Sequence, residues 1–314
     1  MIRFFTVFLT LLVLAGPTQA QTPPDNAQKY VKIRLLPERA TIAPGEEIWV
    51  GVEQSIHPGW HTYWRNPGDS GSDPKIRWTL PEGFEIGEIH WPTPHKLPFG
   101  PMTNYGYEDN VILLQKLKAP ATVPQGPVEL KAEIEILVCE EICIPEFGKY
   151  TMTLNSSDSG TDNAAYLGEA IAKLPTQAPD TAGLRKGADG KMELEIPSAA
   201  WCNHGDKPCA DLEIFPLEWG IVNNTGQAEI LFDGQKLSLR QQAGERDWAE
   251  LEAPRVLIAY TNAQGVRAGM EFAASLEGAA AAEMAGMNSD ISSLPLILLL
   301  ALAGGLVLNL MPCV

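Results

Sequence analysis

The sequence predicts an all-β protein with two immunoglobulin-like antiparallel β-sandwich domains followed by a transmembrane α-helix. Apolar and polar residues alternate in several short segments, as they do in half-buried strands. The chain contains 25 prolines and 28 glycines, which favour turns between short strands over long helices. The apolar stretch 294–314, whose only polar side chain is Asn309, is long enough to span a bilayer.

Residues 1–20 resemble a secretory signal peptide in composition. Arg3 supplies the positive start, the stretch 4–15 is apolar apart from threonines, and Ala20 closes a small-residue cleavage site. An N-terminal membrane anchor is the alternative, but the apolar run is short for a span. We therefore expect cleavage after Ala20 and export to an oxidising compartment, where disulfides persist.

The first β-sandwich is predicted over 21–154 and is followed by a linker, 155–176. Its predicted strands are 31–35, 48–52, 76–80, 111–114 and 128–138. In the linker, Asp162 is placed to cap a short helix that ends at Pro175. The apolar face of this helix would carry Tyr166, Leu167, Ala170, Ile171 and Leu174.

The second β-sandwich is predicted over 177–276. Its predicted strands are 192–196, 212–214, 228–232, 236–239 and 256–260. An Ala-, Gly- and Met-rich tether, 277–290, leads to the predicted first transmembrane helix, 291–314. Because the sequence stops inside this apolar segment, we expect it to be the front part of a longer polytopic membrane protein.

The composition excludes some classes of binding partner. A net charge of −16 argues against nucleic acid and against anionic membrane surfaces. The sequence contains no phosphate-binding loop and no Ser/His/Asp arrangement, and we expect no cofactor.

Two cysteines, Cys139 and Cys143, lie between segments of alternating polarity. Both have the odd numbering of the polar face, so we expect them to point away from the core near the tip of a hairpin. Residues four apart in a straight strand are about 13 Å apart, whereas a disulfide needs Cα atoms about 4.4–6.8 Å apart. The pair can bond only if residues 140–142 turn the chain. So short a loop stabilises the fold little, which favours a chemical role.

Glu140, Glu141 and Glu146 follow the first cysteine closely. Negative neighbours raise the pKa of a thiol and disfavour the reactive thiolate. The sequence therefore predicts a site that reacts slowly without a docked partner. Solvated turn residues are the alternative interpretation of these glutamates.

Four segments resemble the N-terminal periplasmic domain of DsbD-type thiol:disulfide interchange proteins, closest to the ScsB branch. They are GWHTYWRNPGD at 59–69, WP at 91–92, YGYE at 105–108 and VCEEICIPE at 138–146. The ending NLMPCV at 309–314 is similar to the first cysteine-bearing membrane helix of the same family. The spacing of three residues between the cysteines is shorter than in the best-known members.

The resemblance implies a protein-disulfide reductase of the bacterial inner membrane, with residues 21–290 in the periplasm. Electrons from cytoplasmic thioredoxin would cross the membrane through Cys313 and a partner cysteine. Cys139 and Cys143 would pass them to thioredoxin-fold periplasmic clients, with Cys143 contacting the client. Because the ScsB branch is named for suppression of copper sensitivity, the resemblance also implies a role of this protein in copper tolerance.

The segment 96–101 resembles the family's cap loop, with Phe99 as the aromatic residue that covers the cysteines. An ordinary β-loop with one anchored phenylalanine is the alternative. For His61, Tyr63 and Trp64, the sequence favours aromatic core packing over catalysis.

A second cysteine pair, Cys202 and Cys209, is predicted to be a structural disulfide. A second redox site, or a metal site that also uses His204, are the alternatives, although metal-binding cysteines usually have closer, paired spacing. Two other functions stay open for the whole chain: a periplasmic copper-binding module, and a structural immunoglobulin-like protein with inert disulfides.

Overall fold

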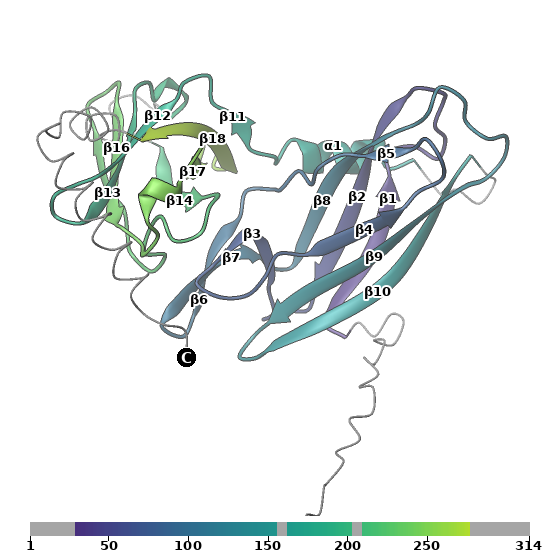
Figure 1. Ribbon diagram of the computed structural model, residues 1–314, viewed down its shortest axis with the longest axis horizontal. Coiled ribbons are helices and arrows are strands. Elements are labelled where there is room, and N and C mark those ends of the chain that lie inside the picture. Colours follow the sequence, from purple (N-terminus) through teal and green to yellow (C-terminus); the bar gives the residue numbers. More distant parts are fainter. Residues whose placement is uncertain (1–28, 156–161, 203–208, 277–314) are drawn as a thin grey trace, which may run out of the picture.

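The computed structural model describes residues 29–155, 162–202 and 209–276. The predicted signal peptide, tether and transmembrane helix lie outside these residues. Within the described part of the chain, no helix has the length and apolar character that a membrane span requires. Figure 1 shows one β-sandwich built from the N-terminal half, a second β unit at the other end, and a small sheet between them.

The first unit is a sandwich of two antiparallel sheets. One sheet has the order β1-β2-β8-β5, formed by Val31–Pro37, Glu47–Ile56, Asn110–Lys118 and Glu85–Ile86. The other has the order β10-β9-β4, formed by Cys143–Leu154, Val128–Cys139 and Lys75–Thr79. All five strands predicted for this unit are present.

The core between these sheets follows the alternation along β9. Val128, Leu130, Ala132, Ile134, Ile136 and Val138 are all buried, and they pack with β2 and β8 residues such as Val52 and Leu113. Burial of this apolar face is the main stabilising contribution to such a sandwich.

Glu146 departs from the sequence expectation. It is 2% exposed and points into the protein instead of lying beside the cysteines. Its carboxylate accepts hydrogen bonds from the backbone N–H groups of Lys29, Tyr30 and Val31, at 2.7, 2.8 and 3.1 Å. Its even number shares the phase of the buried residues of the preceding strand, and the three donors make burial of the charge possible.

The single α-helix of the described residues, α1, spans Ala164–Ile171. Its Leu167 packs on Leu36, Ile112 and Leu114, on the outer face of the first sheet. A side chain at Gly51 would collide with this contact, since its Cβ would lie 2.9 Å from a methyl group of Leu167.

The predicted ends of this helix were wrong. The N-cap residue is Asn163, and Asp162 instead accepts a hydrogen bond from the backbone of Ala40 at 2.6 Å, which ties the linker to the first sandwich. The helix ends at Ile171, well before Pro175, so Leu174 contacts the same cluster from beyond the helix.

The second unit is one sheet folded over its own core, in the order β14-β17-β18-β12-β13-β16-β15, with β11 also beside β18. Short 3-10 turns lie at Ala200–Cys202 and Trp248–Glu250. The strands β11 to β18 are Thr176–Gln177, Ala182–Lys186, Lys191–Ile196, Ala210–Pro216, Glu229–Phe232, Leu237–Gln242, Arg255–Thr261 and Arg267–Leu276.

This unit is sandwich-like, as predicted, but it is not purely antiparallel. β12 and β11 both run parallel to β18. The pairing of β12 with β18 joins the two antiparallel halves of the fold. The halves enclose a core that includes Leu194 and Leu239 from one side and Ile214 and Ile258 from the other.

The two units share a buried apolar cluster. Phe215, Leu217 and Leu257 of the second unit belong to the same cluster as Trp64 and Tyr105 of the first. The ring of Phe215 meets the rings of Trp64 and Tyr105 edge-on, with centroids 6.1 and 4.8 Å apart. The second unit therefore packs directly against the first.

Replacing Glu146 with alanine tests the role of its carboxylate in the fold. We expect Glu146→Ala to lower the free energy of unfolding by about 3 kcal/mol, because three backbone donors lose a charged acceptor. Denaturant unfolding measures the change. Glu146→Gln is the matched variant, which keeps one acceptor oxygen and should lose less. Equal stability of Glu146→Ala and the unchanged protein would contradict this role.

Candidate functional site

A three-stranded sheet that the sequence did not predict forms one wall of the site. It has the order β3-β7-β6, from Thr62–Gly68, Met102–Tyr107 and His95–Phe99. It lies between the first sandwich and the second unit (Figure 1). Short strands with mixed polar and aromatic residues carry little period-2 signal, which explains why the pattern missed them.

The cysteines lie opposite each other at the tip of the β9–β10 hairpin. Cys139 ends β9, Cys143 begins β10, and their Cα atoms are 4.1 Å apart in a disulfide. The backbone N–H of Glu140 donates to the carbonyl of Ile142 at 3.2 Å across the connecting loop. The predicted turn at residues 140–142 is confirmed.

The two sulfur-bearing residues differ in exposure. Cys143 is exposed, but Cys139 is fully buried, so the expectation that both point away into solvent was wrong for Cys139. The cause is His61, just before β3, which forms two backbone hydrogen bonds with Cys139 at 2.9 and 3.0 Å. The polar face of β9 is therefore covered at its end by another layer.

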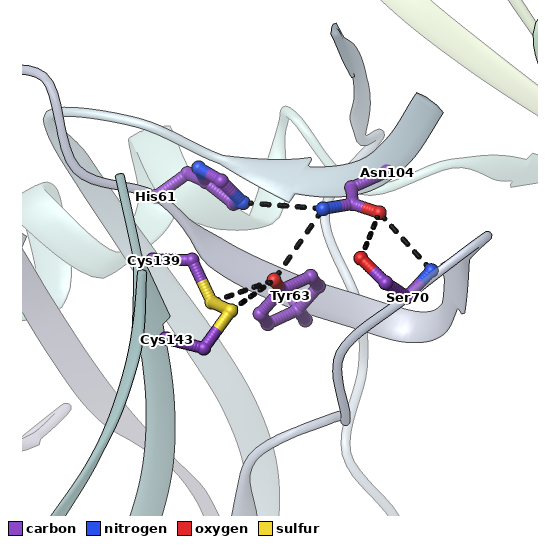
Figure 2. Close-up of a disulfide and its surroundings, with 6 residues drawn as sticks. All are labelled: His61, Tyr63, Ser70, Asn104, Cys139 and Cys143. Atoms are coloured by element: carbon purple, nitrogen blue, oxygen red, sulfur yellow. Dashed lines mark hydrogen bonds between the residues drawn. A yellow bond between two sulfur atoms is a disulfide. The ribbon is translucent and has the colours of Figure 1, made fainter. Parts of the chain in front are cut away.

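Tyr63 contacts the disulfide directly (Figure 2). Its hydroxyl donates a hydrogen bond to Sγ of Cys139 at 2.8 Å and lies 3.6 Å from Sγ of Cys143. Burial raises the pKa of Tyr63 to about 12, so the hydroxyl keeps its proton and remains a donor at neutral pH. Gly71, with φ of +95°, lies flat on the Tyr63 ring, where a Cβ would come within 2.2 Å of it.

Asn104 connects the residues around Tyr63. Its amide nitrogen lies 3.4 Å from the Tyr63 hydroxyl and 3.5 Å from Nε2 of His61. Its amide oxygen accepts from both the backbone N–H and the hydroxyl of Ser70, at 3.1 and 2.9 Å. Burial lowers the pKa of His61, which favours the neutral ring beside the disulfide.

Phe99 lies at the end of β6, next to the tight turn at Gly100 and Pro101. Its ring meets the ring of His61 edge-on, with centroids 6.1 Å apart. His61 in turn meets the ring of Tyr63 at 5.2 Å. The predicted cap residue thus reaches the disulfide's surroundings through His61 and Tyr63.

The loop between the cysteines is exposed. Glu140 and Glu141 both face solvent, as expected for the turn, and Ile142 is 64% exposed. Cys143 and the neighbouring large apolar side chain of Ile142 are thus both exposed to solvent at the tip of the hairpin. Glu146 takes no part in the site.

Cys202 and Cys209 form the other disulfide, buried in the core of the second unit. The backbone N–H of Cys209 also donates to Sγ of Cys202 at 3.0 Å. His204 lies outside the described residues. Among the described residues, no group of three or more His, Cys, Asp or Glu side chains is arranged to hold a metal ion.

A family model of the N-terminal region of the thiol:disulfide interchange protein DsbD matches residues 32–155. The crystal structure of the N-terminal periplasmic domain of ScsB from Proteus mirabilis is similar to this chain with a TM-score of 0.56 and 19% sequence identity, covering 81% of this chain and 96% of that one. Residues 32–155 therefore form a DsbD-type N-terminal region, and the likeness to the ScsB periplasmic domain supports the same fold. The similarity to ScsB extends the shared fold beyond residues 32–155, into the second unit.

Another similar structure is the N-terminal domain of DsbD from Neisseria meningitidis in its reduced form. Its TM-score is 0.23 at 14% identity, and the match covers 39% of this chain and 85% of that one. A comparison with curated proteins gave no match.

Tyr63 is the residue of the candidate site whose contact with sulfur the sequence did not predict. The sequence favoured core packing for His61, Tyr63 and Trp64, and Trp64 does pack in the shared cluster. His61 and Tyr63 are also buried and pack edge-on against each other, but Tyr63 in addition contacts the disulfide through its hydroxyl. The available signal was the resemblance of 59–69 to the DsbD family, which indicates that the segment matters but not which side chains reach sulfur.

Replacing Tyr63 with phenylalanine tests its contact with sulfur. In the reduced protein, we expect Tyr63→Phe to raise the pKa of the Cys139 thiol by about one unit, since the thiolate loses a hydrogen-bond donor worth about 1.5 kcal/mol. The pH dependence of alkylation, resolved by peptide mass, measures this pKa. Tyr260→Phe in the second unit is the control, and an unchanged Cys139 profile in Tyr63→Phe would refute the prediction.

Proposed function

We propose that this chain is the periplasmic part of a membrane thiol:disulfide reductase, with Cys139 and Cys143 as its exchanging pair. The observation that carries the proposal is the asymmetry of the disulfide within a DsbD/ScsB-family region. One sulfur-bearing residue is exposed beside Ile142, and the other is buried under a hydrogen-bond donor. Disulfide exchange needs one sulfur that a partner can reach and control over which sulfur leaves.

In the reducing direction, the Cys143 thiolate attacks a sulfur of the client's disulfide and forms a mixed disulfide, releasing the client's other sulfur as a thiolate that takes up a proton. Cys139, as its thiolate, then attacks Sγ of Cys143. The client leaves as a dithiol, and the Cys139–Cys143 bond forms again. Two electrons pass to the client and the pair is oxidised. The Tyr63 hydroxyl stabilises the Cys139 thiolate at the start of the second step.

The electron source and location follow from the family. We place residues 21–290 in the periplasm and the chain in the bacterial inner membrane, where cytoplasmic thioredoxin supplies electrons through Cys313 and a partner cysteine. The clients are thioredoxin-fold periplasmic proteins, and copper tolerance is the proposed physiological setting. The similarity to the ScsB periplasmic domain and the family match support this assignment.

The Cys202–Cys209 disulfide has a structural role in this proposal. Both residues are buried in the core of the second unit, where a partner's thiolate does not reach them.

Single-cysteine variants test the proposal. We expect Cys139→Ser to accumulate a mixed disulfide between Cys143 and an oxidised thioredoxin-fold oxidoreductase, because the resolving thiol is gone. Non-reducing electrophoresis and peptide mass detect the adduct. Cys143→Ser is the matched control and should trap at least about tenfold less, since the Cys139 sulfur is buried.

Two results would overturn this assignment. Equal trapping by Cys143→Ser would show that Cys139 contacts the partner. A Cys139–Cys143 disulfide that stays intact across a glutathione redox series, while the protein remains folded, would identify it as an inert structural bond.

Phe99 is proposed as a cap over the site. Lids of this kind limit reaction with unintended partners and open for the right one. We expect Phe99→Ala to speed reduction of the Cys139–Cys143 disulfide by dithiothreitol about fivefold, as removal of a contact worth about 1 kcal/mol does. Leu231→Ala, which removes an exposed apolar side chain of the second unit, is the control. Equal rates in Phe99→Ala and the unchanged protein would exclude the cap.

A further inference from the structure

Asn224, in the loop between β14 and β15, joins the second unit to the sheet that carries the site. Its amide nitrogen donates to the Asp69 carboxylate at 2.7 Å. Its amide oxygen accepts from the Tyr105 hydroxyl, also at 2.7 Å. Asn224 is 6% exposed and Tyr105 is fully buried. Both polar groups of the amide are therefore satisfied inside the contact between the units.

The hydrogen-bond partners of Asn224 are close in the structure to the residues that contact the disulfide. Asp69 accepts from the backbone N–H of Thr103 at 2.7 Å and donates its own N–H to the Thr103 carbonyl at 3.1 Å. The neighbouring residues, Ser70 and Asn104, form the hydrogen bonds that end at Tyr63 (Figure 2). Hydrogen bonds, together with the peptide links from Asp69 to Ser70 and from Thr103 to Asn104, thus connect the second unit to the Tyr63 hydroxyl that donates to Cys139.

The base of the β6–β7 hairpin is attached to the second unit as well. Arg267 donates to the carbonyl of Pro94, just before β6, at 2.6 Å, and pairs with Glu213 at 2.7 Å. On β3, the Asn66 side chain donates to the carbonyl of Pro216 at 2.8 Å. The opposite end of the hairpin is open, since Gly100 is exposed and nothing lies within 4 Å of where its Cβ would be.

We propose that the second unit holds the base of the hairpin that carries Phe99, and that Asn224 is a positioning residue that keeps this cap against His61. The inference rests on the proposed function, because it assigns a role in guarding the Cys139–Cys143 pair. A buried amide whose two partners are both polar is costly to replace, since Asp69 and the Tyr105 hydroxyl would each lose a partner. Loosening the base then lets the cap leave the site more often.

The experiment compares the rate at which dithiothreitol reduces Cys139–Cys143 in the whole chain. Asn224→Leu removes the hydrogen bonds to both Asp69 and Tyr105. We expect it to raise this rate at least about fivefold, the factor that the net contribution of one hydrogen bond gives. Tyr105→Phe removes a single hydroxyl and keeps the ring packed on Phe215, so it should act in the same direction even if Asn224→Leu does not fold. Unchanged rates in the variants that fold would overturn the proposal.

Double variants that also carry Phe99→Ala distinguish a positioning role from a general loss of fold stability. Without the Phe99 ring there is no cap for these substitutions to displace. Asn224→Leu or Tyr105→Phe should then change the rate of disulfide reduction by less than about twofold. The same acceleration with and without the Phe99 ring would overturn the proposal, because it would show that the substitutions act through stability of the fold.

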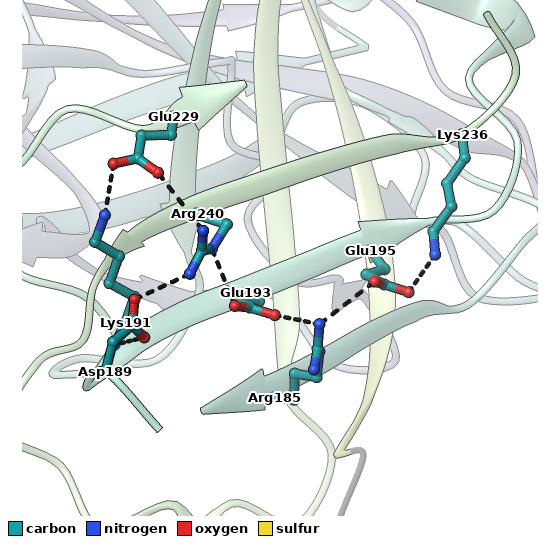
Figure 3. Close-up of polar contacts among 8 residues, drawn as sticks. All are labelled: Arg185, Asp189, Lys191, Glu193, Glu195, Glu229, Lys236 and Arg240. Carbon is teal, nitrogen blue, oxygen red and sulfur yellow. Dashed lines mark hydrogen bonds and ion pairs between the residues drawn. The ribbon is translucent and has the colours of Figure 1, made fainter. Parts of the chain in front are cut away.

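The charged face of the second unit offers a matched control. Figure 3 shows Arg185, Glu193, Glu195, Arg240 and Lys236 in ion pairs across β12, β13 and β16. Lys236→Gln breaks the pair with Glu195 in the same unit as Asn224, with 42% of the Lys236 side chain exposed. It should leave the reduction rate unchanged, because exposed ion pairs contribute little to the stability of the fold. If Lys236→Gln raised the rate as much as Asn224→Leu does, a specific role for Asn224 would be refuted.

The readout is independent of any protein partner. If the single-cysteine variants trap no thioredoxin-fold protein but Asn224→Leu still accelerates reduction in a Phe99-dependent way, the proposed function fails and the positioning role stands. If trapping succeeds and the Asn224 and Tyr105 variants change nothing, only the positioning role fails.

Discussion

The backbone pairing of Cys139 with His61 is the contact on which the site depends. A hairpin tip with two cysteines would ordinarily leave both sulfurs in solvent, because both residues lie on the polar face of their strands. The two hydrogen bonds between Cys139 and His61 bring the start of β3 over one of them. The strand then places Tyr63 two residues further on, with its hydroxyl at Sγ of Cys139.

This arrangement gives the two sulfurs different chemistry. A buried thiolate is costly unless it accepts hydrogen bonds, and the donor that Cys139 meets is a phenol whose own pKa is raised to about 12. Such a donor stabilises a thiolate without giving up its proton. Cys143 has no comparable burial and stands beside the exposed Ile142. In the proposed mechanism, access makes Cys143 the residue that attacks the client first, and Tyr63 stabilises the Cys139 thiolate that attacks second.

Much of the first sandwich was predictable because alternation directly reports which face of a strand is buried. The even-numbered residues from Val128 to Val138 are an example, and Glu146 continues the same phase into β10. The sequence did not show that a carboxylate in this phase would find three backbone donors. Nor could alternation along β9 reveal the burial of Cys139, because the covering strand is distant in sequence and weakly patterned.

The polar contacts between the units matter because apolar packing alone does not fix orientation. Phe215 packs with Trp64 and Tyr105 in the shared cluster, but hydrophobic attraction is non-directional and tolerates sliding. Hydrogen bonds depend steeply on distance and angle, so the buried contacts of Asn224 with Asp69 and Tyr105 are satisfied together at one orientation. A site guarded only by a surface loop would change with each fluctuation of that loop. Here the hairpin of β6 and β7 is attached to the second unit both by the shared apolar cluster and by the hydrogen bonds of Asn224 and Arg267.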